Sequence, residues 1–219
     1  MTSRAPLSRQ AHIHPHLVRL VHKHTSSVYQ RPIPEFSIQA FQHFELLFMS
    51  SGKQRLVIDS GCGTGESTRI FAQQYPSAFV VGLDRSVHRL QKHCLPEQHT
   101  TNYALIRAEL EDFWRLLASH YGNCIEYHAI LYPNPYPKPA HILRRWHGHP
   151  LFPQMLALSP ITELRTNWSL YAEEFAFAAS LLGYAVEFTT LQYSTPITAF
   201  ERKYQQSGHN LFQVLVRPQ

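Results

Sequence analysis

The sequence predicts an α/β fold with a Rossmann-like, mostly parallel sheet that ends in a C-terminal antiparallel hairpin. From Gln54 onward, short apolar runs alternate with helix-like stretches, which is typical of a doubly wound sheet. The pattern changes after Gly183, because Ala185–Leu191 and Leu211–Arg217 both read as strands and no helix of useful length is predicted between them. A series of strand and helix units that ends in two strands indicates a final hairpin.

Five strands and their helices are predicted ahead of the hairpin. The strands are the apolar runs Arg55–Asp59, Ala78–Asp84, Tyr103–Arg107, Tyr127–Tyr132 and Ile161–Thr166. The helices between them are predicted at Glu66–Gln74, Ser86–Lys92, Leu110–His120 and Leu151–Leu158. The clearest helix follows Asn167, because apolar side chains from Trp168 to Leu182 recur every three or four residues. Asn167 is its predicted N-cap, and Gly183 marks its end.

The chain has 219 residues, which is enough for one domain with its own core. We expect the α/β domain over residues 51–219, preceded in residues 1–50 by a basic arm and a covering helix around Ser37–Met49. No apolar run approaches the roughly 18 residues of a membrane-spanning helix, so we expect a soluble, cytoplasmic protein with no membrane partner. The three cysteines lack metal-binding spacing and are expected to be free thiols.

The net charge of +5 is concentrated at the N-terminus. The basic residues that precede the first acid, Glu35, are Arg4, Arg9, Arg19, Lys23 and Arg31. They account for the whole excess, since the rest of the chain is balanced. Such an arm suits a polyanion, above all a nucleic acid, and a solvated tail is the alternative. The arm also holds five histidines with no carboxylate or thiolate beside them, so we predict no metal site.

A glycine-rich turn follows the first predicted strand, in the sequence DSGCGTGE from Asp59 to Glu66. Gly61, Gly63 and Gly65 let the backbone turn tightly and let a ligand approach the main chain where a Cβ would block it. An acid, three alternating glycines and an apolar strand occur together here. We therefore interpret this glycine loop as a ligand-binding turn rather than an ordinary strand-to-helix connection.

S-adenosylmethionine is the ligand that best fits these residues. In dinucleotide folds a pyrophosphate lies at the helix N-terminus, whereas here Glu66 begins the helix and would repel phosphate. Asp59 can balance the ammonium of the methionine end. Asp84 lies 19 residues beyond Gly65, at the distance where an acid accepts hydrogen bonds from ribose hydroxyls. Glu109 follows the third strand and can accept from the adenine amine. We therefore expect S-adenosylmethionine, not NAD, bound by Asp59, Gly61, Gly63, Gly65, Asp84 and Glu109.

These residues, with blocks further along the chain, resemble the tRNA (guanine-N7-)-methyltransferase family. The resemblance runs from about Asp59 to the C-terminus, through DSGCGTGEST, GLDRS, ALIRAELEDF, LYPNPYPKPAHILRRW, ELRTNWSLYAEEFA and TPITAFERKYQQSGH. It implies the class I S-adenosylmethionine-dependent methyltransferase fold and methylation of guanine N7 in tRNA. It also implies cofactor positions at Asp59, Asp84 and Glu109, and substrate positions at Lys138, Asn167 and Thr198 to Glu201.

Two positions depart from the family pattern. Members typically have Pro-Asp-Pro-Trp-Pro-Lys where this chain has Pro133–Lys138, PNPYPK, here called the proline loop. They have Thr-Asp-Trp where this chain has Thr166-Asn167-Trp168. Guanine N7 carries no proton, so its attack on a sulfonium methyl needs no general base. The change from Asp to Asn at position 134 therefore bears on recognition of the base more than on the chemical step.

Three interpretations of Asn134 are open. Its amide can accept from a ring N–H and donate to a neighbouring carbonyl, which suits guanine N1–H and O6 or uracil N3–H and O4. Asn-Pro-Tyr is also similar to the Asn-Pro-Pro-aromatic loop of methyltransferases that act on exocyclic amines. The third interpretation is a structural turn with Asn134 as a local cap. We assign the catalytic role to Asn134 and Lys138, and place Asn134 at the cofactor as well.

A basic rim, which includes His141, follows the proline loop and suits phosphates, and a solvated loop is the alternative. We expect RNA, above all tRNA, as the partner, no metal, and a monomer or homodimer. The alternative functions are a methyltransferase for another base atom or substrate, such as an exocyclic amine or a uracil-like site, and a non-catalytic RNA-binding homologue. The predicted substrate-binding residues are Lys138, Arg144, Arg145, Asn167, Thr198, Phe200 and Glu201.

Overall fold

The computed structural model describes residues 3–92, 102–191 and 195–219. The chain forms two compact units. Arg31–Leu131 is here called the glycine-loop unit, and Met1–Gln30 with Tyr132–Gln219 the proline-loop unit. The segment expected as an arm with a covering helix is shared between them, because the arm belongs to the proline-loop unit and helix α2 (Glu35–Ser50) to the glycine-loop unit.

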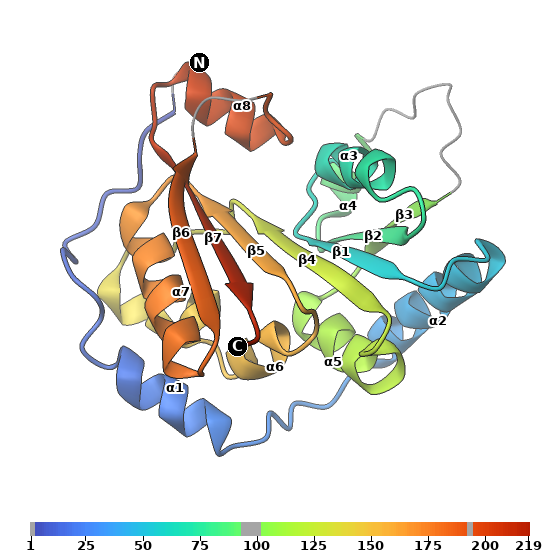
Figure 1. The fold of residues 1–219 in the computed structure, drawn as a ribbon, viewed down its shortest axis with the longest axis horizontal. Helices are drawn as coiled ribbons and strands as arrows, with labels where there is room; N and C mark the ends of the chain where they lie inside the picture. Colours follow the sequence, from blue (N-terminus) through green and yellow to red (C-terminus); the bar gives the residue numbers. More distant parts are fainter. Residues whose placement is uncertain (1–2, 93–101, 192–194) are drawn as a thin grey trace. The chain divides into compact units, whose positions relative to one another are not determined.

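In the glycine-loop unit, four parallel strands lie in the order β3-β2-β1-β4 (Figure 1). Strands β1 and β2 are buried along their whole length, which explains their continuous apolar runs. Parallel strands end at the same edge of a sheet, so the residues at the ends of β1, β2 and β3 come close together. The elements are β1 (Leu56–Ser60), α3 (Glu66–Gln74), β2 (Phe79–Asp84), α4 (Val87–Leu90), β3 (Tyr103–Arg107), α5 (Leu110–Tyr121) and β4 (Ile125–Leu131).

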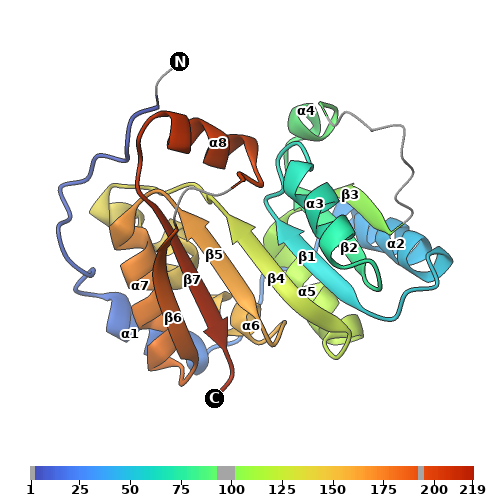
Figure 2. The ribbon, with the colours of Figure 1, turned by 45° about the horizontal axis from the view of Figure 1, so that its top comes forward.

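Helices cover both faces of this sheet. Figure 2 shows α3 in front of β1 and β2, and α2 with α5 behind them. Aromatic rings fill the layer behind the sheet, with centroids 5.2–6.3 Å apart between elements. A buried hydrogen bond from Ser37 Oγ to Asp112 Oδ2 (2.8 Å) also joins α2 to α5. Helix α2 is therefore an integral part of the unit. The rings belong to Phe41, Phe44, Phe48, Phe79, Phe113 and Tyr121.

In the proline-loop unit, three strands lie in the order β5-β7-β6 and pair antiparallel. Strands β6 and β7 form the predicted C-terminal hairpin, so the expected mostly parallel sheet with a final hairpin is confirmed. The elements are α1 (Leu17–Thr25), the 3₁₀ helices η1 (Pro139–Arg144) and η2 (Trp146–Gly148), α6 (Phe152–Leu156), β5 (Thr162–Thr166), α7 (Ser169–Leu181), β6 (Ala185–Leu191), α8 (Ala199–Gln206) and β7 (Leu211–Arg217).

Helix α7 is buried on two sides. It packs on β6 and β7 with one side and on α1 with another (Figure 1). Its buried residues accordingly run from Leu170 to Ala179 and surround most of the helix. Glu174 lies among them and is fully buried. A carboxylate in such a place requires charged or hydrogen-bonding partners.

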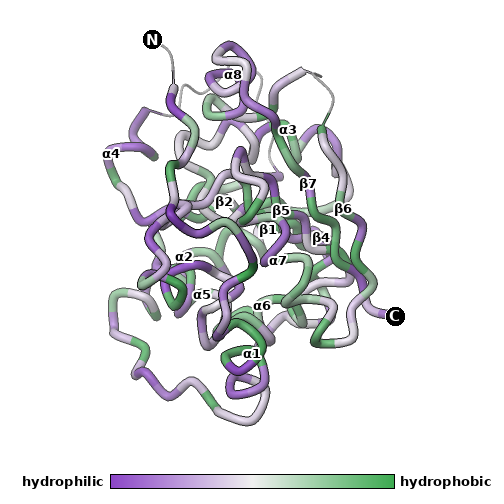
Figure 3. The backbone as a smooth tube through the Cα atoms, turned by 90° about the vertical axis from the view of Figure 1, so that its left-hand side faces the viewer, coloured by the Kyte–Doolittle hydropathy of each residue, from purple (hydrophilic) through white to green (hydrophobic). Residues whose placement is uncertain are grey.

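The predicted strands and helices lie within two residues of the observed ones, but α1, η1, η2 and α8 of the proline-loop unit are not among the predicted elements, and the predicted N-cap of α7 differs. The expected absence of a helix before the last strand is wrong, because α8 occupies that position. Figure 3 shows that α8 is mainly hydrophilic, whereas β6 and β7 are mainly hydrophobic. The predicted N-cap Asn167 is also wrong, since Trp168 holds that position and its N–H donates to Thr166 Oγ1 (3.2 Å). Gly183 ends the helix as predicted, with φ of +81°.

Within the described ranges, no helix combines the length and the apolar character that a membrane crossing requires. Cys62 and Cys124 are free thiols, as expected, and Cys94 lies outside the described residues.

Gly82 of β2 allows α3 to approach the sheet closely. A Cβ at this position would lie 2.7 Å from Leu105 Cδ2 and closer still to Thr68 Oγ1. We expect Gly82→Ala to lower the free energy of unfolding by about 1–3 kcal/mol, since the added methyl overpacks a dense region. Urea unfolding of the variant and the parent protein measures the difference.

A second substitution tests whether Thr68 is the side chain that limits the space at Gly82. Thr68→Ala removes the nearest side chain, so the double variant Gly82→Ala with Thr68→Ala should lose less stability than the sum of the two single changes. Strict additivity would show that Thr68 does not limit the space at Gly82.

Candidate active site

The glycine loop connects β1 to α3 with a left-handed backbone at each glycine. The φ angle is +79° at Gly61, +62° at Gly63 and +78° at Gly65. A Cβ at Gly61 or Gly63 would meet no heavy atom of the described residues within 4 Å, so the space beside the loop is open. The N–H groups of Gly61 and Cys62 donate to Leu83 O at 2.7 and 3.0 Å. The loop is thus tied to β2 while its outer side can receive a ligand.

Asp59 is a buried acid at the start of this loop. Its Oδ2 accepts hydrogen bonds from Ser67 Oγ (2.7 Å) and Thr68 Oγ1 (2.6 Å) in the first turn of α3. Its Oδ1 has no partner among the residues that the structure describes. Burial raises the pKa of Asp59 to about 6, the two hydroxyls oppose this rise, and Asp84 adds to it. A buried carboxylate with one unsatisfied oxygen favours a cationic ligand.

Asp84, at the end of β2, is buried as well and holds the glycine loop in place. Its Oδ2 accepts from the Gly63 N–H (2.9 Å), and its Oδ1 accepts from the Ser86 N–H (2.7 Å). Arg89 of α4 forms an ion pair with Oδ1 at 3.1 Å. A carboxylate oxygen accepts two hydrogen bonds, so Oδ2 retains capacity for the ribose hydroxyl that the sequence predicts.

Glu109 stands at the N-cap position of α5, directly after β3. Its side chain is half-buried and makes no capping hydrogen bond to the helix. A carboxylate that does not cap its own helix is available to an external donor, such as an adenine amine.

These residues fit S-adenosylmethionine. Asp59 Oδ1 offers negative charge for the ammonium, and the open glycine backbone leaves room for the methionine chain. Asp84 and Glu109 offer acceptors at the ends of neighbouring strands for the nucleoside. Over the described part of the chain, no group of three or more His, Cys, Asp or Glu side chains is arranged to hold a metal ion.

The proline loop has a strained backbone. Tyr132, just before it, and Tyr136 within it have φ of +52° and +44°, a left-handed conformation that residues with a side chain rarely adopt. Asn134 is exposed, and its Oδ1 accepts from the Tyr136 N–H at 3.4 Å. The side chain therefore forms a weak local turn, as one of the three interpretations expects, and its amide N–H groups have no partner among the described residues. Lys138 is exposed.

The two consecutive arginines after this loop have different surroundings. Arg144 is exposed, and its guanidinium lies 4.3 Å from the ring centre of Tyr136. Arg145 is fully buried, 4.9 Å from the Trp168 ring, and ion-paired to Glu174 at 2.6 Å. The predicted place of Arg145 in an exposed basic rim is therefore wrong, because its charge is used inside the protein. Arg144 is at the surface, and its place in a substrate-binding basic rim stays a prediction.

Asn167 is held by His209. Its Nδ2 lies 3.0 Å from His209 Nδ1, and His209 Nε2 lies 3.1 Å from Ser3 O. An amide nitrogen donates and a carbonyl oxygen accepts, so this arrangement assigns the proton to Nε2. The ring also stacks on Tyr204 of α8 at 5.3 Å. An aspartate at position 167 would instead require His209 to donate from both ring nitrogens.

Two of the three predicted substrate residues near α8 cap that helix. Thr198 Oγ1 accepts from the Glu201 N–H (2.9 Å), and Glu201 Oε2 accepts from the Ile197 N–H (3.1 Å). Glu201 is 1% exposed and also binds Arg165 at 3.1 Å. Phe200 is 46% exposed, so it is the member of this group that presents a surface to solvent.

Sequence reasoning missed the side chains that hold these acids and loops. Ser67 and Thr68 could not be recognised from the sequence, because small hydroxyl residues at the start of a helix are common. Glu174 left a clearer signal, since an acid inside the apolar stripe YAEEFAFAA indicates a buried pair. His209 left none, because its partners Asn167 and Ser3 are distant in sequence.

A family model described as "Putative methyltransferase" matches residues 53–214. The chain belongs to this methyltransferase family. It is 24% identical over 173 residues to the tRNA (guanine-N(7)-)-methyltransferase of Leifsonia xyli subsp. xyli (strain CTCB07), covering 74% of this chain and 75% of that protein. It is 28% identical over 172 residues to the protein of the same name from Burkholderia vietnamiensis (strain G4 / LMG 22486), covering 74% and 66%. The protein is an S-adenosylmethionine-dependent methyltransferase.

Solved methyltransferase structures share the fold. An antibiotic-related methyltransferase superposes with a TM-score of 0.58 at 16% identity, covering 90% of this chain and 98% of that one. The 16S rRNA methyltransferase KamB gives 0.55 at 18% identity, covering 88% and 99%. The predicted class I methyltransferase fold is confirmed.

The charge on Asp59 is expected to lower the stability of the ligand-free protein. Because folding raises this pKa from 3.8 to about 6, stability falls as pH rises through that window, and the loss is complete above it. A pKa shift of about two units corresponds to about 3 kcal/mol of folding free energy. We expect Asp59→Asn to increase the free energy of unfolding at pH 8 by on the order of 1–3 kcal/mol, with the gain shrinking toward pH 4.5. Urea unfolding at both pH values measures it.

The same substitution should weaken binding of S-adenosylmethionine about 10- to 100-fold, since a charge-assisted hydrogen bond contributes about 1.5–3 kcal/mol. Asp112→Asn is the matched control, because Asp112 is also fully buried in this unit but accepts from Ser37. Calorimetry should give equal affinities for the control and the parent. An unchanged affinity in Asp59→Asn would show that Asp59 does not contact the ligand.

Proposed function

We propose that this protein transfers a methyl group from S-adenosylmethionine to N7 of a guanine in tRNA. The observation that carries the proposal is the similarity, over about three quarters of the chain, to several proteins named tRNA (guanine-N(7)-)-methyltransferase. The exposed amide, aromatic ring and basic groups of the proline loop support it, because they offer hydrogen bonds, stacking and phosphate contacts to an unpaired nucleotide.

The cofactor, when bound, supplies a methyl group on a positively charged sulfur. In the proposed arrangement, Asp59 holds the ammonium end, while Asp84 and Glu109 hold the ribose and adenine. The glycine loop contributes backbone surface instead of side chains, which keeps the ligand close to β1. The protein's contribution to the rate is then mainly to orient the methyl group and exclude other approaches.

Methylation of guanine N7 needs no proton transfer from the base, since N7 has a free lone pair and carries no proton. Asn134 is proposed to hold the base through its amide, with Tyr136 as a surface for stacking. Lys138 and Arg144 are proposed to contact phosphates of the RNA, and Phe200 and Asn167 to border the base. The neutral amide binds guanine more weakly than a carboxylate would, since a neutral hydrogen bond contributes about 0.5–1.5 kcal/mol and one to a charged group about 1.5–3 kcal/mol.

Asn134 also supports a second candidate function, methylation of another base atom. Its amide N–H groups have no partner among the described residues, so they can donate to a carbonyl such as O4 of uracil. A carboxylate cannot donate in this way. The RNA substrate is the same in kind, and the modified atom differs.

Nucleoside analysis separates these candidates. RNA from a strain that lacks this gene should lose part of its N7-methylguanosine, and the purified protein with S-adenosylmethionine should restore it on that RNA. Mass spectrometry of the digested nucleosides measures both. If N7-methylguanosine is unchanged and another methylated nucleoside disappears, the second candidate is the function.

Restoring the family's acid at one position tests the role of the amide. If guanine N7 is the target, Asn134→Asp should lower the KM for RNA about 3- to 30-fold, because a charged acceptor binds N1–H and N2–H of guanine more tightly. Asn167→Asp is the comparison, and we expect it to give no such gain, since His209 Nδ1 accepts from the amide at this position. Lower activity in Asn134→Asp would indicate that the amide's donor is used and would favour another base atom.

A further inference from the structure

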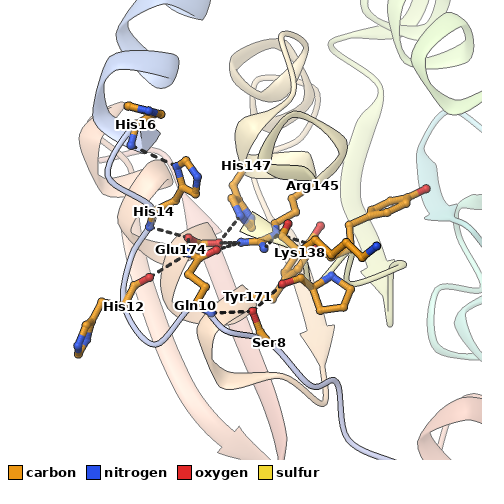
Figure 4. Close-up of polar contacts among 12 residues, drawn as sticks. Ser8, Gln10, His12, His14, His16, Lys138, Arg145, His147, Tyr171 and Glu174 are labelled. Atoms are coloured by element: carbon orange, nitrogen blue, oxygen red, sulfur yellow. Dashed lines mark hydrogen bonds and ion pairs between the residues drawn. The ribbon is translucent and has the colours of Figure 1, made fainter. Parts of the chain in front are cut away.

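We propose that the N-terminal arm and the buried pair Arg145–Glu174 form a clamp that holds the proline loop in one conformation. The clamp consists of Ser8, Gln10, Arg145 and Glu174, all within the proline-loop unit (Figure 4). These four side chains position Asn134 and Lys138, and this positioning role rests on the proposed function.

The proline loop cannot hold itself. Pro133, Pro135 and Pro137 have no N–H, so every second residue of the loop cannot donate a backbone hydrogen bond that would help to form a turn. Tyr132 and Tyr136 have positive φ, and such backbone conformations persist only where the surroundings fix them. The internal contact found, from the Tyr136 N–H to Asn134 Oδ1, is long at 3.4 Å. The loop therefore depends on donors from elsewhere in the chain.

Side-chain donors reach three consecutive carbonyls. Arg145 Nε donates to Tyr136 O (3.2 Å) and Arg145 Nη2 donates more weakly to Lys138 O (3.4 Å), which also accepts from the His141 N–H (2.9 Å). The carbonyl between them, Pro137 O, accepts from Ser8 Oγ of the arm at 2.6 Å. A planar guanidinium fixes two carbonyls at once in a way that a single ammonium cannot.

Glu174 fixes the guanidinium in turn. Its Oε2 accepts from Arg145 Nη1 (2.6 Å) and lies 2.9 Å from His147 Nε2. Its Oε1 accepts from the His14 N–H at 2.8 Å. Burial alone would raise the pKa of Glu174, but the hydrogen bond from His147 and the charge of Arg145 hold it at about 2, so the carboxylate is ionised.

Gln10 joins the arm to both charged groups. Its Nε2 donates to Glu174 Oε1 (2.6 Å), and its Oε1 accepts from Arg145 Nη1 (3.0 Å). Figure 4 shows Gln10 and Ser8 on the same stretch of the arm, beside Glu174 and Arg145. Docking of the arm and the conformation of the loop are therefore coupled. The arm is thus more than a solvated basic tail.

Hydrogen exchange tests the clamp directly. In the double variant Ser8→Ala with Gln10→Ala, peptides that cover residues 132–138 should exchange several-fold faster, whereas peptides from β1 and β2 should not change. The matched control is Leu7→Ala with His12→Ala, two exposed side chains of the same stretch, which should leave exchange as in the parent. Unchanged loop exchange in the first variant, or equal acceleration in the control, would overturn the proposal.

Kinetics then tests positioning. With the RNA that the parent methylates, the Ser8→Ala, Gln10→Ala variant should lose on the order of 10- to 100-fold in kcat, because misplacing a reacting group by about 1 Å has that effect. Its KM for S-adenosylmethionine should stay within about twofold. Faster loop exchange without a fall in kcat would overturn the positioning role.

A second substitution separates positioning from loss of folding. Arg145→Lys retains the charge beside Glu174 but cannot donate to both Tyr136 O and Lys138 O, so it should reproduce the kcat loss with an intact thermal transition. Full activity in Arg145→Lys would contradict the clamp. If the parent methylates no guanine N7, the proposed substrate fails, while the exchange measurement still decides the clamp.

Discussion

The buried ion pair between Arg145 and Glu174 organises the proline-loop unit. It joins helix α7, the residue ahead of η2 and the N-terminal arm, three segments that are separate in the sequence. A charge that lost its partner here would be strongly destabilising, by about 3–5 kcal/mol. Such pairs add little net stability compared with apolar residues, but they permit few alternative arrangements. The conformation of the proline loop is one of the features that they specify.

The glycine-loop unit presents the opposite situation. Asp59 is equally buried, yet two hydroxyls and no cation accompany it, and one carboxylate oxygen is left without a partner among the described residues. The ligand-free protein therefore carries an electrostatic penalty that a cationic ligand relieves. The two units illustrate how a buried acid can be satisfied by the protein itself or be left for a ligand to satisfy.

Much of the fold was predictable because it follows from local periodicity. Strands β1 and β2 are continuous apolar runs, and the stripe of α7 marks a helix. Helix α8 was not predictable in the same way, since few of its residues are apolar and its start is stabilised by the Thr198 and Glu201 caps and by distant Arg165. Asp59, the glycines and Asp84 could be grouped from the sequence because parallel strands bring their ends together.

Contacts between side chains that are far apart in the sequence could not be predicted from it. Arg144 and Arg145 are adjacent and chemically identical, and what distinguishes them is Glu174, 29 residues away from Arg145. The same holds for Asn167, whose partner His209 is 42 residues further on. A sequence shows that such side chains are polar, but only the folded chain shows which of them is already engaged.

The beginning of the chain has a practical consequence for handling the protein. The Ser3 N–H donates to Ser207 Oγ (2.8 Å) and the Ser3 carbonyl accepts from His209 Nε2 (3.1 Å), so Ser3 lies beside the end of α8. Affinity tags or reporter domains attached there would crowd the imidazole that steadies Asn167. The C-terminus leaves β7 at the far end of that strand, so an attachment at Gln219 avoids this neighbourhood.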